Sequence, residues 1–150
     1  MSNVENGFQQ GGTDGKNALF VGGSNIPTYA SFKITAGGAN VCEVKISIED
    51  GKNATIAKPF LRLIHLSDDA DGVGLTSTTA SGTVTAKTGE GAVFATAVAK
   101  KCLEVQTKAD GTFTLEITDS AKTGFYVCVQ HPLTGEAIVS RQLVTADYGS

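Results

Sequence analysis

Residues 110–130 read DGTFTLEITDSAKTGFYVCVQ, and this stretch decides the fold. It opens with an Asp-Gly pair, which supplies the positive φ that a tight turn needs. Phe113, Leu115 and Ile117 then alternate with polar residues, the two-residue period of a strand that buries one face. A second run rich in aromatic and branched residues follows at 124–130. The stretch therefore predicts two strands of an antiparallel β-structure.

The same pattern extends outward along the chain. Residues 42–48 (CEVKISI) alternate cleanly, and residues 60–66 are apolar on both faces, which predicts a strand covered on both sides. Residues 92–101 compete as a helix but lack a full 3.6-residue apolar stripe. Further candidate strands are 31–35, 81–86, 93–98, 102–107 and 137–144. Roughly eight or nine short strands with regular turns predict an all-β antiparallel sandwich, in either an immunoglobulin-like or a jelly-roll order.

The first part of the chain has a different composition. Residues 1–29 are rich in Gly, Asn, Gln and Ser, so they cannot bury enough apolar surface to fold alone. We expect either a tail without a fold of its own or an extended Gly-rich N-terminal arm that orders on a partner, followed by a sandwich domain at 30–150. The candidate partner-binding residues are the apolar side chains of the arm and two tyrosines outside the clear strands: Leu19, Phe20, Val21, Ile26, Tyr29 and Tyr148.

Composition and charge exclude several classes of function. The formal net charge is −3 and the pI about 5.3, so the chain lacks the basic surplus that nucleic-acid binding needs. No stretch approaches the ~20 apolar residues of a membrane helix. The N-terminus shows neither a basic n-region nor an apolar h-region, so we expect no secretory signal. Nucleic acid and membrane are therefore not expected partners.

No set of residues indicates an active site. The two histidines, His65 and His131, are far apart in sequence, and no nucleophile, base and orienting group come together, so we expect no enzyme and no cofactor. The loop with Asp68, Asp69 and Asp71 offers oxygen ligands, but an EF-hand frame lacks its final glutamate. A solvated turn is the interpretation we favour for this loop, and calcium binding is the alternative.

Two resemblances add to this picture. Tyr126 and Cys128, after the strand at 112–118, resemble the corner of an immunoglobulin-type domain, where a tyrosine two residues before a cysteine hydrogen-bonds back to the chain. Cys42 stands where the first cysteine of that family would. The resemblance implies a sandwich. Three cysteines without a secretory signal indicate reduced, buried thiols. A Cys42–Cys128 bridge is the alternative.

The wider chain, 31–144, resembles small bacteriophage virion proteins with an immunoglobulin-like sandwich, in its acidic Asp-Asp-x-Asp-Gly loop, Gly/Thr-rich middle, Asp-Gly turn and Pro-x-x-Gly hairpin. The resemblance implies a capsid decoration or cement protein, located in the virion and assembled in the host cytoplasm. The implied partner is the major capsid protein or another virion protein, and a trimer is the favoured homo-oligomer. The alternatives are a neck, tail or fibre-base adaptor and a secreted adhesin or carbohydrate-binding module.

Overall fold

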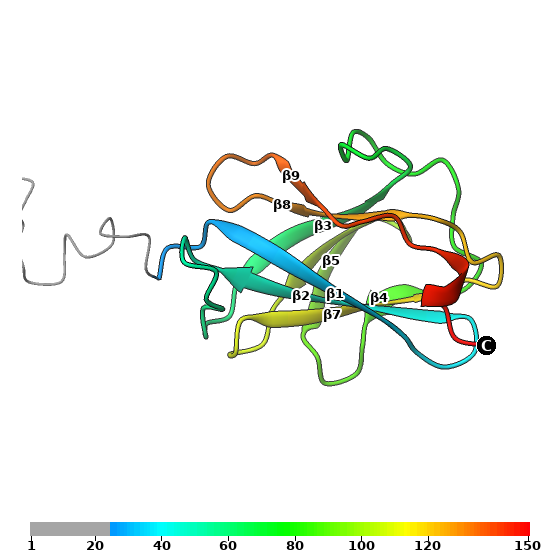
Figure 1. The fold of residues 1–150 in the computed structure, drawn as a ribbon, viewed down its shortest axis with the longest axis horizontal. Helices are drawn as coiled ribbons and strands as arrows, with labels where there is room; N and C mark the ends of the chain where they lie inside the picture. Colours follow the sequence, from blue (N-terminus) through cyan, green and yellow to red (C-terminus); the bar gives the residue numbers. More distant parts are fainter. Residues whose placement is uncertain (1–24) are drawn as a thin grey trace, which may run out of the picture.

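The computed structural model describes residues 25–150, which form two antiparallel sheets packed face to face (Figure 1). The four-stranded sheet has the order β1-β2-β7-β4, with bounds Tyr29–Ala36, Val41–Glu49, Thr112–Thr118 and Val84–Ala86. The five-stranded sheet has the order β5-β6-β3-β8-β9, with bounds Ala92–Val98, Cys102–Gln106, Leu61–Ser67, Tyr126–Gln130 and Ala137–Val139. One 3-10 turn, η2 (Thr145–Asp147), follows. The prediction of an all-β antiparallel sandwich is confirmed.

Seven strands are ordered as in an immunoglobulin-type sandwich. In constant-type domains the first, second, fifth and fourth strands form one sheet in that order, and the third, sixth and seventh form the other. Here β1, β2, β7 and β4 pair in one sheet, and β3, β8 and β9 pair in the other. The chain departs from that pattern by two additional strands, β5 and β6, which come between β4 and β7 in sequence and extend the second sheet beside β3. Of the two predicted strand orders, the immunoglobulin-like one is the better description.

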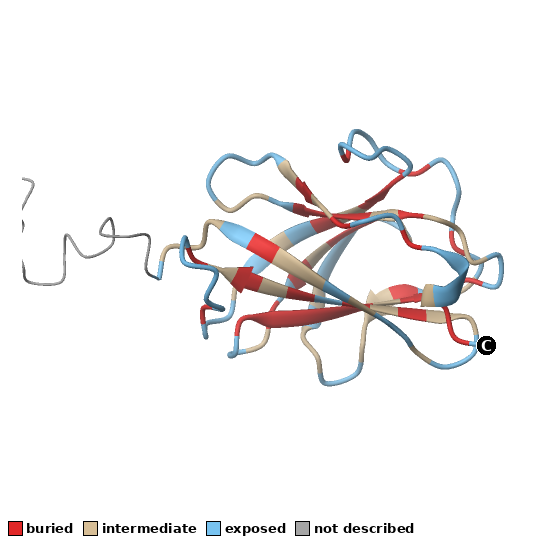
Figure 2. Ribbon diagram, in the orientation of Figure 1, coloured by how far each residue is buried: buried red, intermediate tan, exposed pale blue. Residues whose placement is uncertain are grey.

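The centre of the core comes from β2 and β7, as their alternation predicts. Val44 lies opposite Leu115 and Ile46 opposite Phe113, and all four side chains are at most 1% exposed. Figure 2 shows buried residues along both strands. Their polar neighbours along each strand face away from the core. Burial of each such side chain contributes roughly 1.5–3 kcal/mol relative to exposure. These two strands therefore set the inward and outward faces of the four-stranded sheet.

The prediction that residues 60–66 are covered on both faces is wrong for the first half of β3. Leu61 and Leu63 are 43% and 36% exposed, whereas Ile64 and Leu66 lie in the core. A loop of residues 68–76, here called the covering loop, folds back over the second half of the strand only. The Thr76 amide donates to the Leu66 carbonyl oxygen at 2.7 Å. The outer side of the first half of β3 is left open.

Residues 92–98 form a strand, β5, and not the competing helix. β5 pairs with β6 along the free edge of the five-stranded sheet, with a register shift between Val93 and Ala95 and another between Thr96 and Val98. Each shift places one extra residue in β5, which is a β-bulge. Phe94, the extra residue of the first bulge, is 66% exposed. The bulges interrupt the two-residue period of inward and outward side chains, so the sequence of this alanine-rich strand shows little alternation.

The C-terminal segment differs most from the sequence expectation. The predicted strand 137–144 is a regular strand only over Ala137–Val139. Beyond it the amides of Ser140 and Leu143 still donate to the carbonyl oxygens of Val127 and Phe125, both at 2.9 Å, before the chain reaches η2. Tyr148 is 3% exposed, and its hydroxyl donates to the Thr123 carbonyl oxygen at 2.7 Å. The β7–β8 corner is thus tied by Tyr148, a residue from the end of the chain, whereas the resemblance assigned that role to Tyr126.

The two ends of the described chain lie at opposite ends of the sandwich (Figure 1). The Thr28 amide donates to the Glu49 carbonyl oxygen, at the end of the β1–β2 pair where β1 begins. At the other end of the pair, the Gly149 carbonyl oxygen accepts from the Asn40 amide at 2.8 Å. The predicted arm at 1–29 lies mostly outside the described residues.

Candidate interaction surface

The outer face of the four-stranded sheet is polar. Lys33, Lys45 and Thr114 line a shallow hollow on this face, together with Glu43 and Lys87, which form an ion pair. Hydrogen bonding to Glu43 raises the pKa of Lys87. Such mixed, paired charges are typical of a solvated sheet face.

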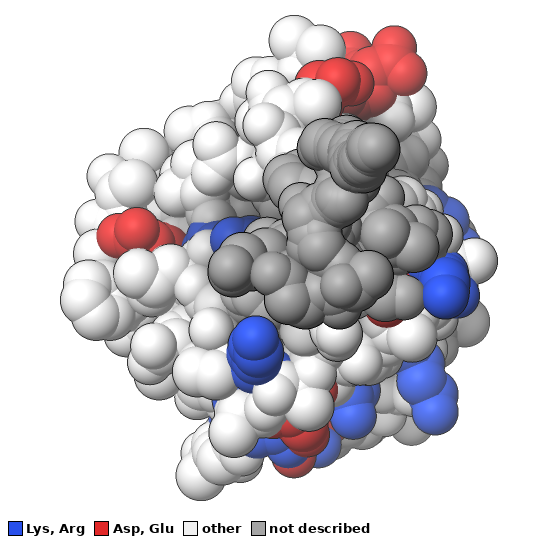
Figure 3. All heavy atoms as spheres, turned by 90° about the vertical axis from the view of Figure 1, so that its left-hand side faces the viewer, with Lys and Arg blue, Asp and Glu red and all other residues white. Residues whose placement is uncertain are grey.

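The end of the sandwich drawn in Figure 3 also carries both signs of charge among its described residues.

The outer face of the five-stranded sheet mixes apolar and polar side chains, and the covering loop closes one half of it. The ring Nε2 of His65 donates to the Gly72 carbonyl oxygen at 2.9 Å. Gly72 has φ +73°, and a Cβ placed on it would lie 2.9 Å from side-chain carbons of Ala137 and Val139 and 3.1 Å from the Cys128 sulfur. Only glycine fits so close to the sheet. The loop therefore serves this half of the face as an intramolecular cover.

The other half of this face has no cover among the described residues. Two rows of side chains cross β5, β6 and β3 in register, one made of Ala92, Gln106 and Leu61 and the other of Ala95, Glu104 and Leu63. Both alanines and both leucines of these rows are exposed.

Val98, at the end of β5, is 41% exposed. We call Leu61, Leu63, Ala92, Ala95 and Val98 the open apolar face. Phe94 lies beside it on the free edge. Gln106 and Glu104 of β6 lie within the two rows, between the alanines of β5 and the leucines of β3. Exposed apolar side chains grouped on one sheet face in this way mark candidate contact surfaces.

The cysteines have the environment of structural thiols. All three are free and buried. Cys42 belongs to the core, whereas Cys128 points to the opposite side of its sheet, toward Gly72, because its neighbours Val127 and Val129 fill the core positions. The Cys42–Cys128 bridge is therefore not formed. Burial raises the pKa of Cys42 to about 12 and that of Cys128 to about 11, which disfavours the thiolate that a nucleophile or a metal ligand needs.

The acidic loop uses its carboxylates locally. Asp68 accepts hydrogen bonds from the Thr76 hydroxyl and from the Ser77 amide and hydroxyl, and these bonds lower its pKa. Asp69 accepts from the Asp71 amide at 2.7 Å. Within residues 25–150, no group of three or more His, Cys, Asp or Glu residues is placed to hold a metal ion. The contacts are those of a turn that shapes the covering loop.

The predicted partner-binding residues fall in three places. Leu19, Phe20 and Val21 lie outside the described residues. Ile26 is half-buried. Tyr29, at the start of β1, is 46% exposed, so its ring is accessible to a partner. Tyr148 is buried in the core, and its expected role as an interface anchor does not fit that position.

The sequence interpretation missed the open apolar face. Its available signals were the doubly apolar run at 60–66 and the uncharged run at 92–98.

Comparisons of the chain with protein-family models, with curated protein sequences and with solved structures gave no match. In the part of the chain that the structure describes, no helix has the length and hydropathy to cross a membrane.

Proposed function

We propose that this protein is a bacteriophage structural protein that binds the assembled head shell as a decoration or cement protein. The observation that supports this proposal best is the open apolar face, because exposed apolar side chains on one outer face of a sandwich, with a polar outer face on the opposite side, suit one-sided attachment to a protein surface. The resemblance to phage virion proteins supplies the identity of the surface. The raised pKa values of the buried thiols also favour a structural role over nucleophilic chemistry.

The attachment has two parts in this proposal. The open apolar face supplies the buried contact, and a basic group on the shell protein lies opposite Glu104. Residues 1–29 extend over neighbouring shell subunits, with Leu19, Phe20, Val21 and Ile26 as anchors and Tyr29 at the junction. Ordering such an arm costs roughly 1–2 kcal/mol per residue, so it requires an extensive surface. Repeated attachment over one shell adds avidity.

The first experiment measures copy number in purified native particles by quantitative mass spectrometry against the most abundant shell protein. A simple ratio, such as one-to-one or one-to-three, is expected for a protein that decorates the whole shell. A dozen copies or fewer would replace this proposal with a neck, tail or fibre-base role. Absence from particles would end it.

A second experiment tests the face itself with two matched variants. Leu61 and Leu75 are 43% and 44% exposed, but only Leu61 belongs to the open apolar face. We expect Leu61→Ser to weaken shell binding about tenfold, as loss of an interface anchor does, and Leu75→Ser to bind as the unaltered protein does. Equal binding by both variants would contradict the role of this face.

A further inference from the structure

The edge strands of the two sheets differ in how well they are protected from pairing with another chain. β4 and β9 have three residues each, and β1 carries Lys33 near its middle. Short edge strands and edge lysines are the usual protection against such pairing. β5 is seven residues long and reads AVFATAV, without a charged residue. Among residues 25–150, β5 is therefore the long edge strand that carries no charge.

The backbone of β5 is unpaired on the side away from β6. Within the described chain, no peptide group of residues 92–97 hydrogen-bonds to a backbone group outside β6. The side chains do not cover this edge, since six of the seven residues of β5 are exposed and Val93 is half-buried. Free N–H and C=O groups along an edge strand are a template that an extended strand of another chain can complete.

The two bulges of β5 bend this edge but do not end it. Pairing with β6 resumes at Ala95 after the extra residue Phe94, and again at Val98 after the extra residue Ala97. A two-fold axis between Ala95 and Thr96 sets Phe94 of one copy opposite Ala97 of a second copy. The bulges of the two edges then face each other. A second copy of β5 thus has the same bend as the edge that it meets, which a regular strand lacks.

Charges just beyond the two ends of β5 fit an antiparallel pair of copies. Glu90 precedes the strand, and Lys100 and Lys101 follow it. Neither lysine forms an ion pair with a carboxylate of residues 25–150, and Glu90 accepts from Lys108 through Oε1 only, at 2.9 Å. Antiparallel pairing brings Glu90 of each copy to the end of the joint where the two lysines of the other copy lie. Parallel pairing would bring like charges together, which is destabilising.

We propose that the free edge of β5 pairs with β5 of a second copy of this chain, antiparallel and around a two-fold axis. The contact is isologous, because the same edge serves both copies. The two five-stranded sheets then join into one continuous sheet. Since the axis of such a pair is perpendicular to the sheet, the open apolar faces of both copies lie on the same side of it. The proposal does not rest on shell binding, because it concerns only contact between copies.

The test is sedimentation equilibrium of the full chain over a series of concentrations, combined with amide hydrogen exchange. We expect reversible association from 15.4 kDa to twice that mass. The amides of β5 that do not donate to β6 should be protected in the dimer and lose protection on dilution. Phe94→Lys places a charge on the edge and should raise the dissociation constant of the dimer at least about tenfold. Because Phe94 is 66% exposed, this change leaves the fold in place.

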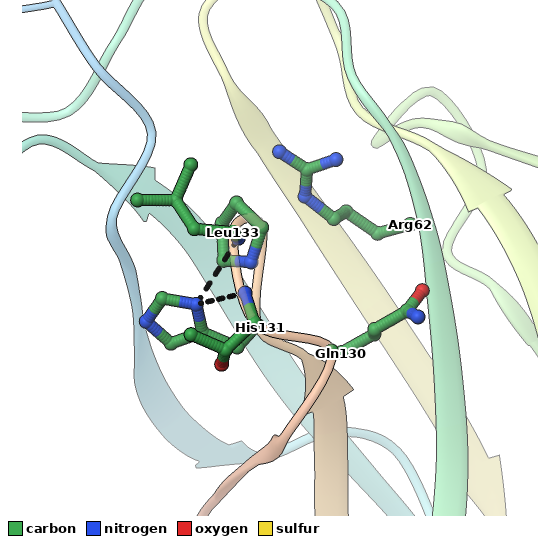
Figure 4. Close-up of a pocket in the computed structure, with 7 residues that line it drawn as sticks. Arg62, Gln130, His131 and Leu133 are labelled. Atoms are coloured by element: carbon green, nitrogen blue, oxygen red, sulfur yellow. Dashed lines mark hydrogen bonds between the residues drawn. The ribbon is translucent and has the colours of Figure 1, made fainter.

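Leu133→Lys is the matched control. Leu133 is 63% exposed and lies in the turn between β8 and β9, at the other side of the same sheet. The His131 ring accepts from the Leu133 amide at 3.1 Å, a backbone bond that the new side chain leaves in place (Figure 4). We expect Leu133→Lys and Leu61→Ser to dimerise as the unaltered chain does, because neither residue lies on the β5 edge. Loss of shell binding in Leu61→Ser with the dimer intact separates this proposal from the proposed function.

Three results would overturn the proposal. One is a mass of 15.4 kDa at every concentration. Protected β5 amides in that monomer would mean that a segment of the same chain fills the edge. Another is a dimer that Phe94→Lys leaves intact, which would place the contact elsewhere on the molecule. The third is a closed trimer, the state that the resemblance implies, because two-fold pairing of one edge closes at two copies.

Discussion

Asp119 holds the corner between β7 and β8 with its carboxylate. It is 1% exposed, and its oxygens accept from the amides of Ser81, Ala121 and Thr123 at 3.0, 3.3 and 2.9 Å. Burial alone would raise the pKa of Asp119, but hydrogen bonds from the Thr123 side chain and from these amides outweigh it and lower the pKa to about 2. The hydrogen bonds that tie the loop before β4 to the corner are therefore strongest when Asp119 is ionised.

This shift predicts an acid-dependent stability. A carboxyl group whose pKa is lower in the folded state contributes stability above its unfolded pKa and loses it as pH falls through the folded value. For Asp119 that loss runs from about pH 4 to about pH 2. We expect Asp119→Asn to cost about 1–3 kcal/mol of unfolding free energy at pH 7 and to flatten this acid limb, as measured by urea unfolding at several pH values. The same change at exposed Asp71 serves as the control, and an equal cost there would contradict the assignment.

Substitutions at Gly72 and Gly74 distinguish the cost of backbone strain from the cost of steric contact. Their φ angles are +73° and +74°, but a Cβ at Gly74 meets nothing within 4 Å, whereas one at Gly72 meets Ala137, Val139 and Cys128. Gly74→Ala should cost only the left-handed backbone penalty, about 1–2 kcal/mol. Gly72→Ala should cost about 1–3 kcal/mol more because the covering loop must move off the sheet. Thermal unfolding of both variants provides the comparison, and equal losses would show that the loop does not press on the sheet.

In the strand β5, the bulges reverse the order of burial that side-chain size would predict. Val93 packs against the core, while its larger neighbour Phe94 is the extra residue of the bulge and is 66% exposed. We expect Val93→Ala to cost about 1 kcal/mol of unfolding free energy and Phe94→Ala to change it by less than about 0.5 kcal/mol. Chemical denaturation of the two variants checks this. A larger loss for Phe94→Ala would mean that the register of β5 is different.

Sequence periodicity predicts elements that face the core on one side without interruption. β2 and β7 meet that condition, so their inward residues could be identified in advance. β3 and β5 do not, for different reasons. The cover over β3 comes from a loop that reaches only its second half, and the bulges in β5 break the two-residue period. The open apolar face lies where these two strands flank β6. Its position depends on the register between strands and on where the covering loop lies, and the sequence pattern of a single strand reveals neither.

The role of Tyr148 was hidden for a similar reason. A tyrosine near the end of a chain has no local pattern that marks it as core. Its hydrogen bond to Thr123 joins residues 25 positions apart in sequence. By contrast, the cysteines were correctly interpreted as buried thiols, because their strands alternate strongly around them.

For the whole molecule, the arrangement of the two sheets determines the reactivity of the thiols. We expect three reactive thiols per chain in denaturant without reductant, because all three cysteines are free. Burial raises the pKa of all three thiols, but Cys102 is 9% exposed whereas Cys42 and Cys128 are 0% exposed, so Cys102 should react first in the folded protein. Titration with a thiol reagent at pH 8 measures both quantities. A single reactive thiol in denaturant would restore the Cys42–Cys128 bridge.

The opposite placement of Asn25 and Gly149 has a practical meaning for anyone who fuses a cargo to this protein. The nine residues of β2 separate the two sites by about 30 Å, at the usual rise of a strand. A fluorescent protein or antigen appended after Ser150 would emerge beside Ala39, at the end of the sandwich opposite Asn25 (Figure 1). Because the proposed function places the open apolar face against the shell, the strands would run along the shell surface, and the cargo would stand at the end of the sandwich remote from Asn25.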